Sequence, residues 1–225
     1  MIVTETRPNT TTFLQAVRTG QVDAVRLMLR DTPALALTHD SQGVSALLLS
    51  VFYERPGVTR LLVSAGVPLN LFEACALGRL DAVRALLDAD RGWLDGFSTQ
   101  GFTPLSLAAS FGHTAVVSEL LDRGAYIDLY DRSYRAGTAL DAAVSGDQTD
   151  TALLLLSRGA QPNVQDSHHL TPLHKAAGHG NGILLEALLL YGADPDVRAT
   201  DGRTPSDYLL EGCDGGLDFL SSGPR

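Results

Sequence analysis

The sequence predicts an all-α solenoid in which pairs of short antiparallel helices stack on one another, with short β-hairpin fingers between most pairs. Three observations predict it: a segment that recurs along the chain, a helix-start signal at the head of most copies, and a second helix with an apolar stripe in each copy. One such unit cannot bury its apolar face alone, so several units must stack to form a continuous core.

The recurring segment runs from a Thr or Ser to a Gly that lies 21 positions later. Four copies keep this distance, and they run from Ser45 to Gly66, from Thr103 to Gly124, from Thr138 to Gly159 and from Thr171 to Gly192. A truncated fifth copy begins at Thr204, 33 positions after Thr171. The period is therefore about 33 to 35 residues, a length typical of helical repeat proteins.

Each copy carries signals for two helices. A Thr followed by Pro, as in Thr103-Pro104, favours a helix start, because the hydroxyl caps the helix and Pro lacks only an N–H that the first turn does not use. A Gly with positive φ is expected to end this first helix in several copies, at Gly78, Gly112 and Gly180. The second helix then carries an inward apolar stripe, formed in one copy by Val116, Val117, Leu120 and Leu121.

The run Thr171-Pro172-Leu173-His174-Lys175-Ala176-Ala177, with Gly192-Ala193-Asp194 downstream, resembles the ankyrin repeat. The tetratricopeptide repeat has a similar length but lacks this Thr-Pro-Leu-His signature. The resemblance extends from about Thr11 to Leu220, and it implies that His174 hydrogen-bonds the backbone of neighbouring fingers. It also implies one domain over residues 10–220, with about six to seven repeats including caps, between flexible tails at 1–9 and 221–225. The approximate repeats are 10–39, 40–69, 70–97, 98–132, 133–165, 166–198 and 199–220.

A second level of repetition predicts an irregular joint. The segment from Gly20 to Gly66 matches the segment from Gly78 to Gly124 at an offset of 58, less than two full repeats. The missing piece is the Thr-Pro finger, which is absent before Phe13 and before Phe72. Only residues 67–70 separate one copy from the next helix at this joint, so we expect no hairpin and an uncapped helix start there. The stack is interpreted as containing a duplicated two-repeat unit.

Composition and charge exclude several classes of function. Seventeen Lys and Arg stand against 26 Asp and Glu, a net charge of −9, which argues against non-specific binding to nucleic acid or to anionic membranes. Two distant Cys form neither a disulfide framework nor a four-ligand zinc site. The N-terminus lacks a secretory pattern, and no apolar run approaches the ~20 residues of a membrane span. We therefore expect a cytoplasmic monomer that binds another protein.

Residues that could carry chemistry have simpler interpretations. Zinc or another transition metal could be proposed at the cluster His168, His169, His174 and His179, but no Cys or carboxylate recurs at ligand spacing around it. His169 occupies a finger position that is usually Gly. Cys75 aligns with a packed helix position, which favours a buried structural thiol. Because no phosphate loop or nucleophile set is visible either, we expect no catalytic residue, no metal and no cofactor.

The variable positions indicate where a partner would bind. In ankyrin stacks the finger tips and the last turn of the first helix line a concave groove. The register places ten candidates there: Phe52, Tyr53, Leu77, Phe102, Phe111, Tyr134, Arg135, His168, His179 and Tyr191. Six of them are aromatic, and aromatic residues and Arg are enriched in binding hot spots. The alternative is that some of them, Phe52 and Phe111 above all, only pack against a neighbouring repeat.

The leading functional hypothesis is a non-enzymatic module that binds a partner protein in this concave groove. Its alternative is a regulatory or metal-dependent enzyme-associated domain that uses the region of His168, His174 and His179. A third possibility is self-association through the irregular joint at residues 67–70.

The joint also predicts uneven stability. In the copy before it, Ser45-Ala46-Leu47-Leu48 replaces the Thr-Pro-Leu-His signature, and the joint itself has lost a finger. We expect the first 70 residues to exchange amide hydrogens faster than residues 98–198, by a difference in local free energy of about 2–3 kcal/mol. Hydrogen exchange measured by mass spectrometry tests this, and equal protection of the two regions would contradict it.

Overall fold

The computed structural model describes residues 10–133 and 136–211, with side chains as far as Leu209. The expected tails at 1–9 and 221–225 lie outside these residues, as do Tyr134 and Arg135. In chain order the α-helices are α1 (Thr10–Arg18), α2 (Val22–Asp31), α3 (Ala46–Phe52), α4 (Pro56–Ser64), α5 (Leu71–Ala76), α6 (Leu80–Ala89), α7 (Pro104–Ser110), α8 (Thr114–Asp122), α9 (Ala139–Ser145), α10 (Thr149–Ser157), α11 (Pro172–His179), α12 (Gly182–Leu190) and α13 (Pro205–Glu211). Two 3₁₀-helices, η1 (Pro33–Leu37) and η2 (Arg91–Trp93), follow α2 and α6.

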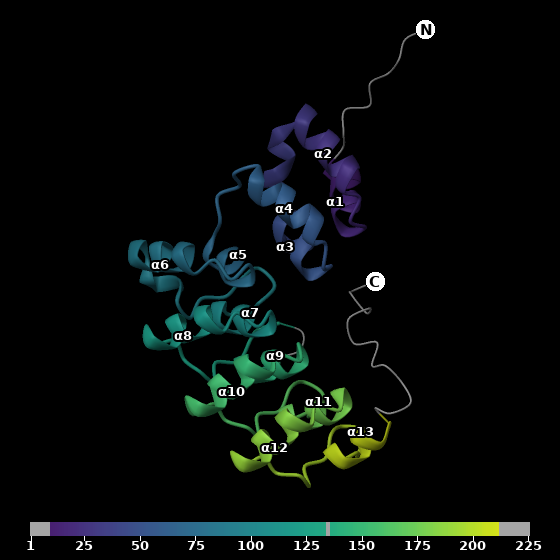
Figure 1. The fold of residues 1–225 in the computed structure, drawn as a ribbon, viewed down its shortest axis with the longest axis vertical. Helices are drawn as coiled ribbons and strands as arrows, with labels where there is room; N and C mark the ends of the chain where they lie inside the picture. Colours follow the sequence, from purple (N-terminus) through teal and green to yellow (C-terminus); the bar gives the residue numbers. More distant parts are fainter. Residues whose placement is uncertain (1–9, 134–135, 212–225) are drawn as a thin grey trace.

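The helices form two rows that run along the molecule (Figure 1). The odd-numbered helices α1 to α13 contact one another in succession and form the inner row. In the outer row α2 packs on α4, and α6, α8, α10 and α12 pack on one another in turn. This arrangement confirms the predicted all-α solenoid of paired antiparallel helices.

The inner helices begin with the caps that the sequence predicts. The Ser45 hydroxyl accepts a hydrogen bond from the backbone N–H of Leu48 at 3.1 Å, and Pro occupies the first turn of α7 and α11. At α7 the Thr103 hydroxyl accepts from the N–H of Ser106, while the Ser106 hydroxyl accepts from the N–H of Thr103. Such reciprocal capping satisfies two backbone groups that a helix start leaves unpaired.

The ends of the inner helices also follow the prediction. Gly78, Gly112 and Gly180 have φ of 65°, 71° and 65°, in the left-handed region that Gly tolerates. Glu54 and Asp147 hold the corresponding places after α3 and α9 with φ of 54° and 53°. The left-handed residue is therefore imposed by the turn into the outer helix, even where the sequence offers no Gly.

The fingers are tight turns, and in each of them a backbone hydrogen bond joins the two ends. Four of these bonds join residues four positions apart, from Asp40 to Val44, Ser98 to Phe102, Asp166 to Leu170 and Ala199 to Arg203. The fifth joins the N–H of Asp131 to the carbonyl of Gly137, so this finger is longer. Within the described residues the fingers make no extended sheet, and one isolated β-bridge joins His39 and Ser45.

Adjacent fingers come into backbone contact. The N–H of Arg132 donates to the carbonyl of Gly101 at 2.7 Å. A Cβ atom on Gly101 would lie 2.5 Å from the carbonyl carbon of Arg132, and the φ of Gly101 is +84°. Gly101 is therefore needed both for its own turn and for the approach of the next finger.

The joint at residues 67–70 lacks a finger, as predicted, but the helix after it is capped, contrary to the prediction. The chain passes directly from α4 to α5 without the closing bond of the other units. The expected uncapped helix start is wrong, however, because Asn70 and Glu73 form a full capping box. The Asn70 side chain accepts from the N–H of Glu73 at 2.9 Å, and the N–H of Asn70 donates to the Glu73 carboxylate at 3.0 Å. Asn is as good a cap as Thr, and Glu is the usual third residue of such a box.

The missing finger brings more distant parts of the chain together. The Thr99 hydroxyl donates to the carbonyl of Gly43 at 3.3 Å, so the fingers before α3 and α7 meet over the short helix α5. The buried core is divided at the same place, with one cluster mainly from Phe13 to Leu62 and another from Leu71 to Ala193. Of α5, only Ala76 belongs to the first cluster.

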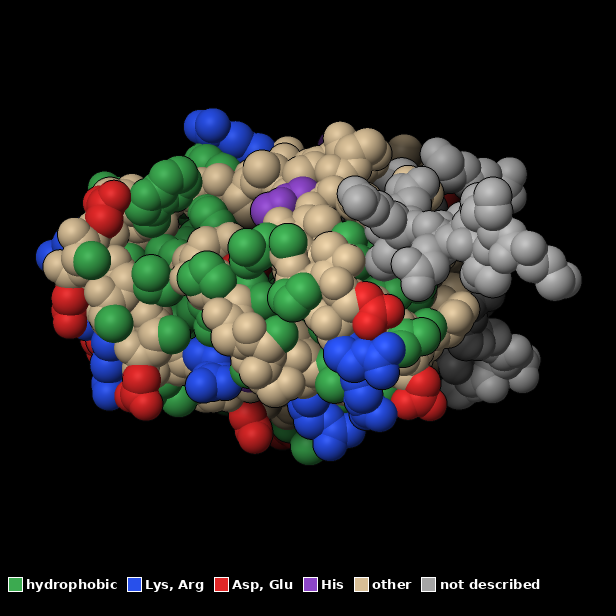
Figure 2. All heavy atoms as spheres, turned by 90° about the horizontal axis from the view of Figure 1, so that it is seen from above, with side chains coloured by type: hydrophobic (Ala, Val, Ile, Leu, Met, Phe, Trp, Pro, Cys, Tyr) green, Lys and Arg blue, Asp and Glu red, His purple; other side chains and the backbone are tan. Residues whose placement is uncertain are grey.

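The end of the stack at α1 and α2 leaves apolar surface uncovered. Figure 2 looks onto this end and shows hydrophobic side chains gathered in the middle of the view, with charged side chains mostly around its edge. Leu27 of α2 and Leu37 of η1 are among the exposed hydrophobic residues of this part of the chain. These leucines lie beside exposed charged residues of α2, among them Asp23, Arg26 and Arg30.

Glu73 is expected to hold the joint together. Its buried carboxylate accepts from the Ser45 hydroxyl at 2.6 Å as well as from the N–H of Asn70. Glu73→Ala should therefore lower the free energy of unfolding by about 2–3 kcal/mol, because the buried Ser45 hydroxyl and the part-buried N–H of Asn70 lose their acceptor. Glu73→Gln keeps one acceptor oxygen and should cost less. Urea unfolding followed by circular dichroism measures both.

The matched control is Glu186→Ala, which removes an exposed Glu from outer helix α12 and should change stability by less than about 0.5 kcal/mol. Equal losses for Glu73→Ala and Glu186→Ala would show that the joint does not depend on this carboxylate.

Candidate functional site

The candidate partner-binding residues are mostly on the inner row and its fingers. Phe52 is the last residue of α3 and Tyr53 its C-cap, Leu77 and Phe111 are the C-caps of α5 and α7, His179 is the last residue of α11, and Phe102 and His168 lie in fingers. Tyr134 and Arg135 fall outside the described residues. The ends of the inner helices and the fingers thus bring seven of the ten candidates to one side of the stack.

Three of these residues form an aromatic cluster over the joint. The Phe52 ring lies 6.0 Å from the Phe102 ring and 6.1 Å from the Phe111 ring, measured between centroids. All three rings are partly buried, and Phe52 and Phe111 pack against both core clusters. The cluster contributes to the packing of the joint and still presents part of its surface to solvent.

Other candidates are more open. Tyr53 is 41% exposed, and His168 and His179 are also exposed, whereas Leu77 is half-buried. The finger turn orients His168, since its backbone N–H donates to the Asp166 carboxylate at 2.8 Å. These exposed side chains can contact another molecule without any opening of the fold.

Tyr191 does not share this face, so its expected position in the groove is wrong. It is the C-cap of α12, which belongs to the outer row. The sequence register counted it among groove positions because it follows a helix end, but the helix that ends there is the second of its pair. Tyr191 is 46% exposed on the outer side of the last complete repeat.

A row of buried polar side chains supports the inner row, and the sequence analysis missed it. The Ser106 hydroxyl donates to the Asp131 carboxylate at 2.7 Å. The Lys175 ammonium lies 2.5 Å from Asp141 and 2.8 Å from Asp166, and all three side chains are nearly excluded from water. The available signal was the fourth position of the Thr-Pro-Leu-His run, which holds a polar residue in most copies.

Burial and pairing shift the pKa values of the carboxylates in this row. Burial raises the pKa of Asp131 to about 6, although hydrogen bonds from Ser106 and Thr103 act in the opposite direction. Burial also tends to raise the pKa of Asp166, but Lys175 and the finger N–H groups outweigh it and lower that pKa. Ionised Asp166 and Lys175 therefore form a stable pair, while ionised Asp131 has no cation among its main partners.

The histidines that were considered as metal ligands do not come together at one site. His174 is 1% exposed, its Nδ1 accepts from the N–H of Thr171 at 3.1 Å, and its Nε2 lies 3.3 Å from the carbonyl of Arg203. The predicted burial and backbone bonding of His174 are confirmed, and burial lowers its pKa so that the ring stays neutral. His168 and His179 are exposed. Among the described residues, no three His, Cys, Asp or Glu side chains are placed to hold a metal ion.

Two further predictions concern single residues. His169 has φ of 58°, as expected of a finger position usually held by Gly. Cys75 is fully buried, and burial raises the pKa of its thiol, so it is a structural side chain with little thiolate character.

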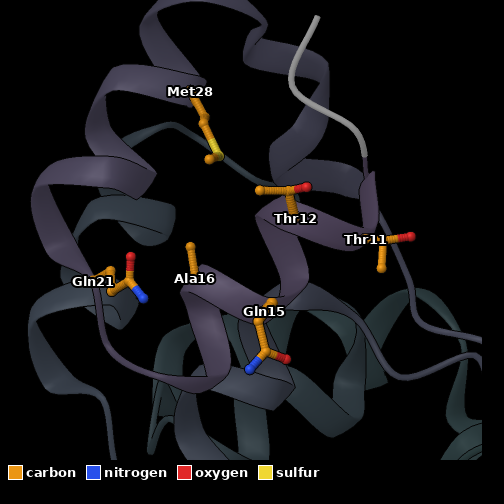
Figure 3. A pocket seen from close by; sticks show the side chains of 6 residues that line it. All are labelled: Thr11, Thr12, Gln15, Ala16, Gln21 and Met28. Atoms are coloured by element: carbon orange, nitrogen blue, oxygen red, sulfur yellow. The ribbon is translucent and has the colours of Figure 1, made fainter. Parts of the chain in front are cut away.

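A cavity of about 350 Å³ lies between α1 and α2 (Figure 3). Its six lining residues are Thr11, Thr12, Gln15, Ala16, Gln21 and Met28. The hydroxyls of Thr11 and Thr12 are its possible nucleophiles, and no acid or base lies among the lining residues to activate them. The hollow can receive a small polar group, but it contains no reactive set.

Comparison with known families agrees with this geometry. Two family models described as ankyrin repeats match the chain, one of three copies over residues 71–166 and one of many copies over residues 155–209. The chain belongs to the ankyrin repeat family. The resemblance seen in the sequence is thereby confirmed, and ankyrin repeat domains in general bind other proteins.

Several curated ankyrin repeat proteins are similar to this chain. An ankyrin repeat-containing protein of Treponema pallidum is 36% identical over 65% of this chain and 50% of its own length. The ankyrin repeat and SOCS box protein 11 of Danio rerio is 43% identical over 48% of this chain and 36% of its own length. The B-cell lymphoma 3 protein homolog of Mus musculus is 32% identical over 74% of this chain and 40% of its own length. The chain thus spans half or less of each of these relatives. In the described part of the ankyrin chain, no helix has the length and apolar character to cross a membrane.

Asp131 gives the ankyrin stack a specific pH dependence. Its pKa of about 6 in the fold exceeds the usual value near 4, so the folded state binds the proton more tightly. The stability that this group contributes is fully present below about pH 4 and is lost as the pH rises through about 6. Relative to Asp131→Asn, the unmodified chain should lose about 2–3 kcal/mol of unfolding free energy between pH 4 and pH 7.

Urea unfolding of both proteins across this pH range measures the difference. Asp150→Asn, on the exposed surface of α10, serves as the control and should show no such pH-dependent difference. A constant difference between Asp131→Asn and the unmodified chain at every pH would contradict the assignment.

Proposed function

We propose that this ankyrin repeat chain is a non-enzymatic protein–protein interaction module that binds a partner protein in the concave groove of its stack. The proposed contact residues are Phe52, Tyr53, Phe102, Phe111, Tyr134, Arg135, His168 and His179. Tyr191 is left out because it lies on the outer row. We also propose that the chain works as a cytoplasmic monomer.

The observation that carries this proposal is the shared placement of exposed and aromatic side chains on one side of the inner row. Tyr53 and His179 are exposed at the ends of α3 and α11, and the cluster of Phe52, Phe102 and Phe111 lies over the joint. Aromatic side chains that are already held in place lose little conformational entropy when they bind. A preformed stack can therefore bind a partner without first becoming ordered.

The buried polar row beneath this face supports the same proposal. Lys175 is neutralised by Asp141 and Asp166, and His174 is engaged on both ring nitrogens. These groups fix the fingers against the inner helices. Their role is structural, and it leaves specificity to the variable residues at the surface.

Affinity purification from the native host, followed by mass spectrometry, tests the proposal. The unmodified chain is compared with Tyr53→Ala/His179→Ala, in which both altered side chains are exposed so that the fold is retained. We expect the main partner to be recovered about tenfold less with the double variant, as hot-spot side chains at an interface usually show.

The matched control is Tyr126→Ala, which removes a 71% exposed tyrosine that follows outer helix α8. It should leave recovery unchanged. Full recovery with the double variant, or an equal loss with Tyr126→Ala, would show that the inner face does not bind the partner.

A further inference from the structure

The outer helices α6, α8 and α10 are linked by ion pairs at their ends. Arg123, the C-cap of α8, reaches back to Asp88 of α6 at 2.6 Å. Arg158, the C-cap of α10, reaches back in the same way to Asp122 of α8 at 2.8 Å. The exposed side of this part of the outer row is therefore charged, as the solvent-facing side of a surface helix usually is.

Helix α12 departs from this pattern. Tyr191 takes the C-cap place that Arg123 and Arg158 hold, so the series of back-reaching arginines stops. One repeat length after Asp150 and Ser157 of α10 stand Ile183 and Leu190, which are 64% and 82% exposed. Leu189 is also exposed, at 48%.

The apolar residues of α12 thus lie on both of its sides. Leu184 and Leu188 are fully buried against the core, while Ile183 and Leu190 face away from it. A helix that is apolar all round is normally covered on every side. We name the exposed side, formed by Ile183, Glu186, Leu189 and Leu190, the α12 outer face. In Figure 1, α12 is the last helix of the outer row.

The charged residues of α12 and of residues 191–196, which directly follow it, are all negative. Glu186 lies between Ile183 and Leu190 on the same side of the helix, at the spacing of one and two turns. Asp194 and Asp196 are exposed in the loop directly after α12. Residues 182–196 contain these three carboxylates and no Lys or Arg.

This charge pattern argues against two possible occupants. If two copies paired through this face about a two-fold axis, Glu186 of each copy would meet Glu186 of the other, and like charges there repel. The end of this chain, residues 212–225, carries Asp214 and Asp218 against a single basic residue, Arg225. It does not complement an acidic rim either.

We propose that the α12 outer face binds an amphipathic helix of another protein, with apolar residues that cover Ile183 and Leu190 and with Lys or Arg opposite Glu186. The apolar contact supplies the attraction, and the carboxylates select a basic partner. This surface is separate from the inner face described under the proposed function, and the inference does not depend on that proposal.

Two synthetic amphipathic peptides of roughly 18 residues serve as probes, long enough to form a helix on binding. They share one leucine face and carry either Lys or Glu at the flanking positions. Fluorescence anisotropy with the full chain should show at least about tenfold tighter binding of the Lys peptide. Ile183→Asp/Leu190→Ser copies the residues of α10 and should weaken that binding about tenfold, while Glu186→Lys should remove the preference for the Lys peptide.

The controls separate this face from others. Leu27→Ser removes an exposed leucine of α2 at the opposite end and should leave peptide binding unchanged. Tyr53→Ala/His179→Ala, which alters the inner face, should do the same. A retained helical spectrum for Ile183→Asp/Leu190→Ser shows that loss of binding is not loss of fold.

Four outcomes would overturn the proposal. The first is equal binding of the Lys and Glu peptides by the unmodified chain. The second is binding of the Lys peptide by Ile183→Asp/Leu190→Ser as tightly as by the unmodified chain. A dimer of the unmodified chain in sedimentation velocity that dissociates in this variant would assign the face to a second copy. Peptide binding that appears only after Leu217, Phe219 and Leu220 are changed to Ser would assign it to the end of this chain.

Discussion

The structure depends on one interaction, the hydrogen bonding at the start of each inner helix. In α5, α7 and α11 the third residue of the helix caps its own first turn and also bonds to a neighbouring unit. Ser106 reaches Asp131 of the following finger at 2.7 Å, and His174 reaches the carbonyl of Arg203 at 3.3 Å. Because each bond serves both the helix and the stack, local and long-range structure form together.

The same interaction explains how the stack continues through its irregular joint. The sequence analysis treated the missing Thr-Pro finger as a missing cap, but Asn70 and Glu73 supply the box in its place, and Glu73 also accepts from Ser45 of the previous unit. The finger is lost while the link between units is kept. The fingers on either side then meet, through Thr99 and Gly43.

Local signals made most of the fold predictable, while contacts between units were not predictable from them. The period, the Thr caps and glycines such as Gly112 depend on a few neighbouring residues, so the sequence alone identified the helix pairs. The candidate site was harder to predict from the sequence than the fold was. Phe52 and Phe111 pack together across the unit that contains α5, a contact between units that no single repeat reveals. Tyr191 was placed on the wrong row because a helix end looks alike in both rows.

The absence of a finger before α5 has a geometric consequence. The inner side of the joint is held close by Phe52, Phe102 and the bridging fingers, while α4 and α6 do not pack as closely as the other neighbouring outer helices. Neighbouring units are therefore closer together in the inner row than in the outer row at this joint. Within the described residues, the joint is the place where the inner row is continuous and the outer row is interrupted.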